Sequence, residues 1–117
     1  MPSEKLPTRY FSDLQEKDIC KKFNATQQPN SGASHFRKGD CVNYLASMLF
    51  EAKTCTSEKE SFSIKKEWIS KNKDEAFTQR VFNGCIAFNF GPNQPNYFVI
   101  DEKLMKFLIE KLEEENN

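Results

Sequence analysis

The sequence has no excess of positive charge, no long apolar run and only one histidine. Its 117 residues include 17 Lys and Arg against 17 Asp and Glu, so the formal net charge is zero. DNA-binding domains usually carry a basic excess, so composition alone does not favour a nucleic-acid partner. No apolar stretch approaches the roughly 20 residues of a membrane span, and residues 1–5 lack the apolar run of a signal peptide. We therefore expect a cytoplasmic protein with no membrane partner.

A clustered set of cysteines is also missing. The four cysteines lie far apart, with no C-x-x-C pair, at Cys20, Cys41, Cys55 and Cys85. This spacing, with a single histidine, argues against a zinc site, and a reducing compartment argues against disulfides. We expect all four to be free, small apolar residues that are buried or half-buried.

The apolar residues that are present suffice for one small packed domain. Hydrophobic residues make up 38% of the chain and include eleven Phe and one Trp. A chain of this length can form a core without disulfide or metal staples. We expect a single domain over residues 1–117, with residues 1–11 and 114–117 as flexible ends.

Apolar periodicity and turn residues predict an α/β fold in the order α-β-β-α-β-β-α, with room for a further strand. Ser12 is expected to cap the first helix, and Ser61 or Ser63 the second. Helices should cover both faces of a small mixed sheet. The expected helices span about 12–24, 63–79 and 102–114, and the expected strands 39–44, 47–55, 85–90 and 96–100.

The run around Glu51 carries the clearest chemical signal. Alternation along a strand puts Glu51 and Lys53 on one face. Asp40 is separated from Glu51 by ten residues and follows a glycine. It is expected on the neighbouring strand, so the three groups should lie within a few ångströms. Two carboxylates suit Mg²⁺, and an ammonium suits the charge on a reacting phosphate. The pattern predicts phosphodiester chemistry, although a solvated surface strand would look the same.

Further segments extend this pattern into a family resemblance. The matching segments are Glu16, Ser31-Gly32-Ala33, Lys38-Gly39-Asp40, Glu51-Ala52-Lys53 and Ser61-Phe62-Ser63-Ile64-Lys65-Lys66-Glu67-Trp68. Together they resemble the PD-(D/E)XK nuclease superfamily over about residues 13–90. They are most similar to its small Holliday-junction-resolvase-like members from archaea, Gram-positive bacteria and phages. Gly39 stands where the superfamily motif has proline.

The resemblance implies a restriction-endonuclease-like core and specific roles for four catalytic residues. Asp40, Glu51 and Glu16 would hold Mg²⁺ or Mn²⁺, and Lys53 would orient or activate the attacking water. Asp13 and Asp18 lie near Glu16 in the sequence and remain alternatives for the first-helix carboxylate.

Two segments are candidates for binding DNA phosphates. One is the loop that contains Gly32, which permits close backbone approach, and the other is the start of the second helix, where backbone N–H groups attract anions. An ordinary loop and a solvated helix face are the plain alternatives, and His35 has no expected role. The expected DNA-binding residues are Ser31, Gly32, Arg37, Lys38, Lys65 and Lys66.

The resemblance therefore implies an Mg²⁺-dependent endonuclease that cuts branched DNA, such as a Holliday (four-way) junction. A junction has two symmetric scissile strands, which a two-fold homodimer would match. The expected location is the cytoplasm, or the host cytoplasm for a phage-encoded protein. Two alternatives remain: a nuclease of the same chemistry on other DNA, and a catalytically silent DNA-binding or assembly module.

Overall fold

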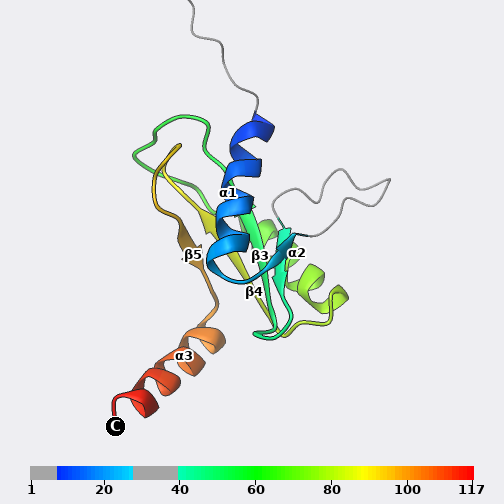
Figure 1. Ribbon diagram of the computed structural model, residues 1–117, viewed down its shortest axis with the longest axis vertical. Helices are drawn as coiled ribbons and strands as arrows, with labels where there is room; N and C mark the ends of the chain where they lie inside the picture. The colour runs from blue at the N-terminus through cyan, green and yellow to red at the C-terminus, as the bar shows by residue number, and fades with distance from the viewer. Residues whose placement is uncertain (1–7, 28–39) are drawn as a thin grey trace, which may run out of the picture.

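The computed structural model describes residues 8–27 and 40–117, and the arrangement of their elements is shown in Figure 1. The described residues form three helices and five strands. In chain order they are α1 (Thr8–Lys22), β1 (Thr26–Gln27), β2 (Asp40–Asn43), β3 (Met48–Lys53), α2 (Lys66–Thr78), β4 (Asn83–Phe88), β5 (Tyr97–Val99) and α3 (Glu102–Glu115).

The five strands form one mixed sheet in the order β1-β2-β3-β4-β5. β2 is antiparallel to both β1 and β3, β4 is parallel to β3, and β5 is antiparallel to β4. The predicted α/β class is confirmed, and the two strands predicted at 39–44 and 47–55 are neighbours, as expected, in the β2–β3 hairpin. The structure adds the two-residue strand β1, which is too short and polar to show an alternating pattern of its own.

Each face of the sheet packs against a different helix, as alternation along β3 requires. On the α1 side, Ile19 packs with Cys41 and Phe50. On the α2 side, Leu49 packs with Ala76 of the helix. Burying side chains of this size contributes about 1.5–3 kcal/mol each. Two separate apolar clusters therefore determine which residues of β3 point toward α1 and which toward α2.

Two predicted helix starts are wrong. α1 begins at Thr8, so Ser12 lies inside the helix and residues 8–11, expected as a flexible end, form its first turn. α2 begins at Lys66, with Lys65 in the extended N-cap conformation and no side-chain cap. Phe62 explains the later start, because its ring stacks on Phe88 with centroids 4.9 Å apart. That contact needs an extended chain before the helix.

α3 forms where it was predicted, but it packs little against the rest of the molecule. Asp101 caps it by accepting a hydrogen bond of 2.9 Å from the Leu104 N–H. The helix then points away from the sheet (Figure 1). Within α3, all of which is described, only Leu104 is buried. None of the described helices is long and apolar enough to cross a membrane.

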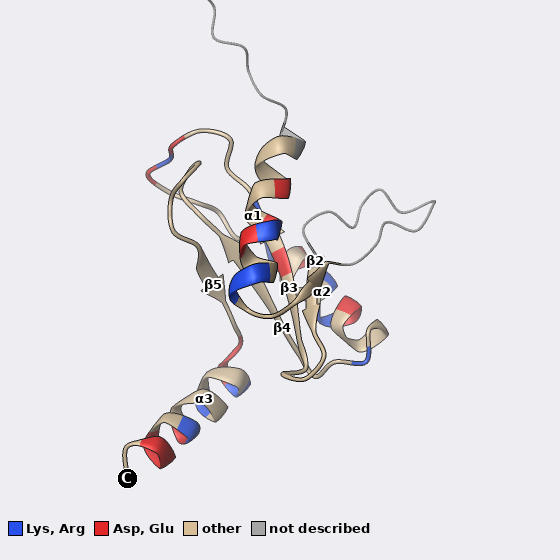
Figure 2. Cartoon of the chain, in the orientation of Figure 1, with Lys and Arg blue, Asp and Glu red and all other residues tan. Residues whose placement is uncertain are grey.

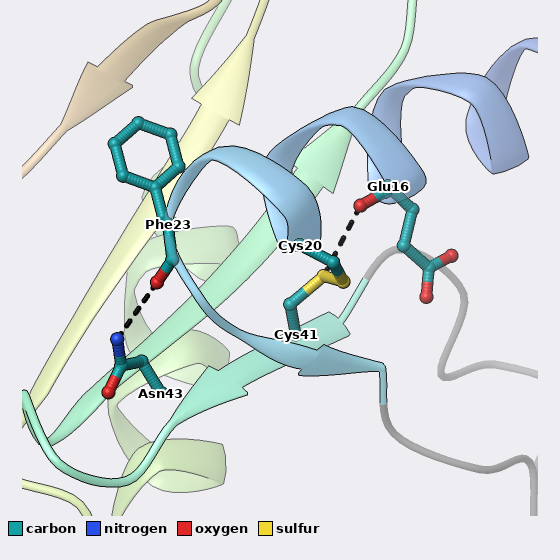
Figure 3. Close-up of a disulfide and its surroundings, with 5 residues drawn as sticks. All are labelled: Glu16, Cys20, Phe23, Cys41 and Asn43. Carbon is teal, nitrogen blue, oxygen red and sulfur yellow. Dashed lines mark hydrogen bonds between the residues drawn. A yellow bond between two sulfur atoms is a disulfide. The ribbon is translucent and has the colours of Figure 1, made fainter.

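The expectation that all four cysteines are free is wrong for Cys20 and Cys41, which form a disulfide (Figure 3). α1 lies on β2, which brings the two Cα atoms to 6.0 Å although 21 positions separate them. Sequence spacing cannot show such a pairing, because the fold creates it. Cys55 and Cys85 are free and buried, as expected.

Candidate active site

Glu51 and Lys53 lie together on the α2 face of β3. The Lys53 Nζ atom is 3.1 Å from the Glu51 Oε2 atom. The side chains are 28% exposed for Lys53 and 17% for Glu51, so both reach solvent from a largely enclosed position. The predicted common face of these two residues is confirmed.

Asp40 occupies the matching position on β2. The antiparallel register pairs Asp40 with Glu51, two residues along the strands from the Val42–Leu49 pair and therefore on the same face. Directly opposed residues share a face, and their Cβ atoms are about 4.5–5.5 Å apart. The Asp40 side chain itself lies outside the described part of the structure. Its backbone nevertheless occupies the position beside Glu51 that the sequence predicted.

Trp68 of α2 contacts the Lys53 ammonium in addition to Glu51. The Lys53 Nζ atom lies 4.4 Å from the centroid of the indole ring, and the Lys65 Nζ atom 5.7 Å from it. A cation over an indole face is attracted by the ring quadrupole, by about 0.5–1 kcal/mol at exposed sites and more when desolvated. Lys53 is thus held between a carboxylate and an aromatic ring. The contact between Lys53 and Trp68 was not predicted from the sequence.

The start of α2 brings more positive charge to this place. Lys65 is the N-cap residue and Lys66 the first helical residue, and both side chains are exposed. The unpaired N–H groups of a helix start attract anions. Elsewhere the charges are mixed: Lys and Arg are interspersed with Asp and Glu along α1 and α3 (Figure 2). The lysines near Trp68 are a local feature rather than part of a basic face.

Glu16 enters from the opposite side of the sheet. It lies in α1, is 3% exposed, and its backbone carbonyl oxygen is 3.5 Å from Cys41 Sγ (Figure 3). Its carboxylate extends away from the disulfide in that view. Of the two alternatives, Asp18 pairs with Lys22 at 3.2 Å and accepts a hydrogen bond of 3.3 Å from Asn96. Asp18 is therefore engaged on the outer part of α1.

Other expected site residues, and His35, lie outside the described part of the chain. The expected loop residues in this group are Ser31, Gly32, Arg37 and Lys38. Among residues whose side chains are described, no group of three or more His, Cys, Asp or Glu could hold a metal ion. A metal site would therefore need the Asp40 carboxylate in addition to Glu51.

A polar network between α1 and the β4–β5 connection was not predicted. Gln15 donates to the Asn96 side-chain oxygen at 3.0 Å and accepts from the Thr54 hydroxyl at 2.7 Å. These residues line a hollow of about 580 Å³. Because single amides and hydroxyls carry no spacing pattern, no sequence signal points to them. Their mutual hydrogen bonds mark a structural network.

The free cysteine Cys85 is unsuited to nucleophilic chemistry at neutral pH. Burial raises the pKa of the Cys85 thiol to about 12, which keeps it protonated. Only the thiolate is a good nucleophile.

No family model matches this chain, and neither a curated protein nor a solved structure does.

Proposed function

We propose that this protein is a metal-dependent endonuclease of the PD-(D/E)XK type with a restriction-endonuclease-like core. The observation that carries the proposal is the half-buried Glu51–Lys53 pair, with the Asp40 position registered opposite Glu51. A hydrolase that acts on phosphodiesters needs anionic metal ligands next to a cation that can face the phosphate. These three positions supply that combination on one face of a mixed sheet.

Asp40 and Glu51 would hold the cation, Mg²⁺ or Mn²⁺. Glu16, the third ligand that the resemblance implied, lies on α1 against the other face of the sheet, so the proposal rests on the first two carboxylates. Carboxylate oxygens are the donors that these hard ions prefer, and Mg²⁺ typically uses one or two of them. When bound, the ion would neutralise phosphate charge and lower the pKa of water. Glu51 fits this role because its side chain is partly exposed yet held in place by Lys53.

Lys53 would face the scissile phosphate and orient the attacking water. Its ammonium has two partners, Glu51 and the Trp68 ring. A phosphate oxygen can replace the carboxylate while the ring still holds the ammonium. The lysine would therefore stay positioned as its ionic partner changes, which favours transition-state charge stabilisation over mere binding.

The proposed DNA contacts surround this centre. Lys65 and Lys66 would bind backbone phosphates at the start of α2. The loop residues proposed beside them are Ser31, Gly32, Arg37 and Lys38. The proposed substrate is branched DNA, such as a Holliday junction, cut by a homodimer with two active sites.

The test is cleavage of a synthetic four-way junction, a linear duplex and a single strand, each with Mg²⁺ and with EDTA. We expect cutting only with Mg²⁺, and loss of cutting in Asp40→Asn and Glu51→Gln while DNA binding persists. Glu60→Gln, in an exposed connection, is the matched control and should cut normally. Equal cutting of all DNAs would indicate a nuclease with another substrate. Binding without cutting would indicate a silent DNA-binding module.

A further inference from the structure

Five aromatic rings form a continuous strip that begins beside Lys53. The sheet register pairs Lys53 with Phe88, and Phe88 with Tyr97. Paired residues on neighbouring strands share a face of the sheet, so these three positions form one row across β3, β4 and β5. From the indole that contacts Lys53, each ring of the strip lies 4.9–6.1 Å from the next, measured between centroids. The rings of this aromatic strip are Trp68, Phe62, Phe88, Phe90 and Tyr97.

The aromatic strip reaches solvent, unlike the aromatic ring in the core. Phe50, which packs under α1, is 7% exposed, whereas Tyr97 is 50% exposed. The other four rings of the strip are half-buried. In the part of the chain that the structure describes, neither buried apolar cluster includes any of the five. The strip is therefore a surface feature and not an extension of the core.

The outer end of the strip offers a ring to a further planar group. Phe62 and Phe88 are stacked on each other, with 25° between their planes. Tyr97 is inclined to Phe88 by 33° and to Phe90 by 65°, so it stacks on neither. Aromatic faces bind other flat π systems in stacked arrangements. With half of its surface open, Tyr97 can take such a group from solution.

Positive charge lies at one end of the strip. The Lys53 and Lys65 ammonium groups are 4.4 Å and 5.7 Å from the Trp68 ring centroid. Near the other end, the Lys59 N–H donates to the Phe90 carbonyl oxygen at 2.7 Å. Lys59 stands between two glutamates in the sequence, so the charge there is mixed. A fitting ligand combines an anionic group for the lysines with flat groups for the rings.

We propose that the aromatic strip binds the unpaired bases of a single-stranded DNA segment. This rests on the proposed function, and it narrows the substrate to branched DNA with an unpaired strand at the branch point. Unpaired bases have open π faces that stack on aromatic side chains whatever their sequence, whereas duplex bases are already stacked. Sugars and apolar peptides also lie on aromatic surfaces, but they carry no phosphate for the lysines beside Trp68.

Stacking also explains how a chain with no net charge could hold DNA. Binding through phosphates alone needs many cations and weakens steeply with salt. Base stacking adds affinity that does not depend on counterion release. With 17 basic and 17 acidic residues, this protein should therefore bind a single strand largely through its bases, with phosphates anchored only near Lys65.

The first experiment uses Trp68 as the reporter, because it is the only tryptophan in the chain. A short oligothymidylate is titrated into the full chain in EDTA, so that nothing is cut. We expect saturable quenching of the fluorescence. A strand of the same length without bases carries the same phosphates and should bind at least about 10-fold more weakly. Equal affinity for the two strands, or no binding of oligothymidylate, would overturn the proposed base contacts.

The second experiment removes one exposed ring. Tyr97→Leu keeps an apolar side chain but not the π face, and should weaken oligothymidylate binding by about 10-fold. Tyr97→Phe keeps the ring and should restore the affinity. Tyr44→Leu is the matched control: Tyr44 is 57% exposed in the β2–β3 turn, and this variant should bind as wild type does. Wild-type affinity in Tyr97→Leu would overturn the role of the strip.

The outcomes separate this proposal from the nuclease activity. With Mg²⁺, a forked duplex with one unpaired arm should be cut faster than a fully paired four-way junction. Faster cutting of the fully paired junction would overturn the narrower substrate and leave the nuclease assignment standing. A protein that binds oligothymidylate through Tyr97 but cuts no DNA would support the strip and count against the proposed function alone.

Discussion

The sheet face that packs against α2 differs at its two ends: one end has paired polar groups and the other has exposed apolar ones. At the end near Lys65, charged and aromatic groups have found partners: Lys53 contacts both Glu51 and Trp68. At the other end, Phe77 and Phe82 stand in solvent beside an open groove. One helix thus connects a pre-arranged polar centre with an uncovered apolar surface. The contrast separates a paired polar cluster from an apolar surface that the described chain leaves uncovered.

The largest effect should come from the polar end. Lys53→Met should lower DNA cleavage by about 100-fold or more, because it removes a charge aimed at the phosphate. Stability should change little, since Met keeps the contact with Trp68 and the ion pair that disappears is partly solvated. Single-turnover cleavage and thermal unfolding measure the two quantities. Lys71→Met, an exposed lysine on α2, is the control. Equal loss of activity in both variants would remove the special role of Lys53.

The next effect is on stability at the apolar end. A Cβ atom at Gly84 would collide with the side-chain oxygen of Asn72, which is buried and donates to the Cys85 carbonyl at 3.3 Å. Gly84→Ala should therefore destabilise the protein by about 1–3 kcal/mol, as overpacking does. Urea unfolding measures the change. In combination with Asn72→Ala the cost of Gly84→Ala should shrink, because the collision is gone. An unchanged cost would mean that the strand moves instead.

A smaller effect concerns DNA binding at the polar end. Lys65→Ala with Lys66→Ala should weaken binding to every DNA alike and reduce the log–log salt slope by roughly 0.9 for each phosphate that the variant no longer neutralises. Arg37→Ala and Lys38→Ala, added to Lys65→Ala, should reduce it further. A salt titration of junction binding measures the slope. An identical slope in wild type and variants would place the DNA on another face.

The smallest effect is at the cap of α3. The Leu104 N–H bond, helped by Lys73 at 3.5 Å, lowers the pKa of the Asp101 carboxyl below its ordinary value of 3.8. A lowered folded-state pKa stabilises the protein above pH 3.8, and this contribution is lost as the pH falls through the folded pKa. Asp101→Ala should cost about 1 kcal/mol at pH 7, whereas Asp101→Asn, also a good cap, should cost less. Urea unfolding at pH 7 and below pH 3.8 measures both. A cost of Asp101→Ala that persists at the lower pH would contradict a role for the charge.

Local pattern was enough to predict much of the polar end. The alternation around Phe50 placed Glu51 and Lys53 on one face, and the turn after Asn43 gave the hairpin that registers Asp40 with Glu51. Both features depend on neighbouring residues. The α/β class followed for the same reason, because most of its elements carry their own periodicity.

Features that depend on contacts between distant residues could not be predicted from the sequence. The start of α2 depends on the stacking of Phe62 on Phe88, and the disulfide depends on how α1 lies on β2. Phe77, near the end of α2, is 85% exposed on the open groove, and no local pattern marks it as exposed. An apolar stripe shows that a surface needs covering but does not say whether its own chain covers it. The metal-binding role of Glu16 stays a prediction. Its helix packs on the face of the sheet opposite Glu51, and local sequence could not show this.

The Cys20–Cys41 bond also changes what one cut in the backbone can do. It closes residues 20–41 into a covalent ring, which includes the proposed DNA-binding residues Ser31, Gly32, Arg37 and Lys38. A protease that cleaves once inside this ring leaves two pieces still joined through sulfur. The nicked protein would migrate as one species on a denaturing gel without reductant and as two with it. The ring therefore makes the connection between α1 and β2 independent of any single peptide bond between them.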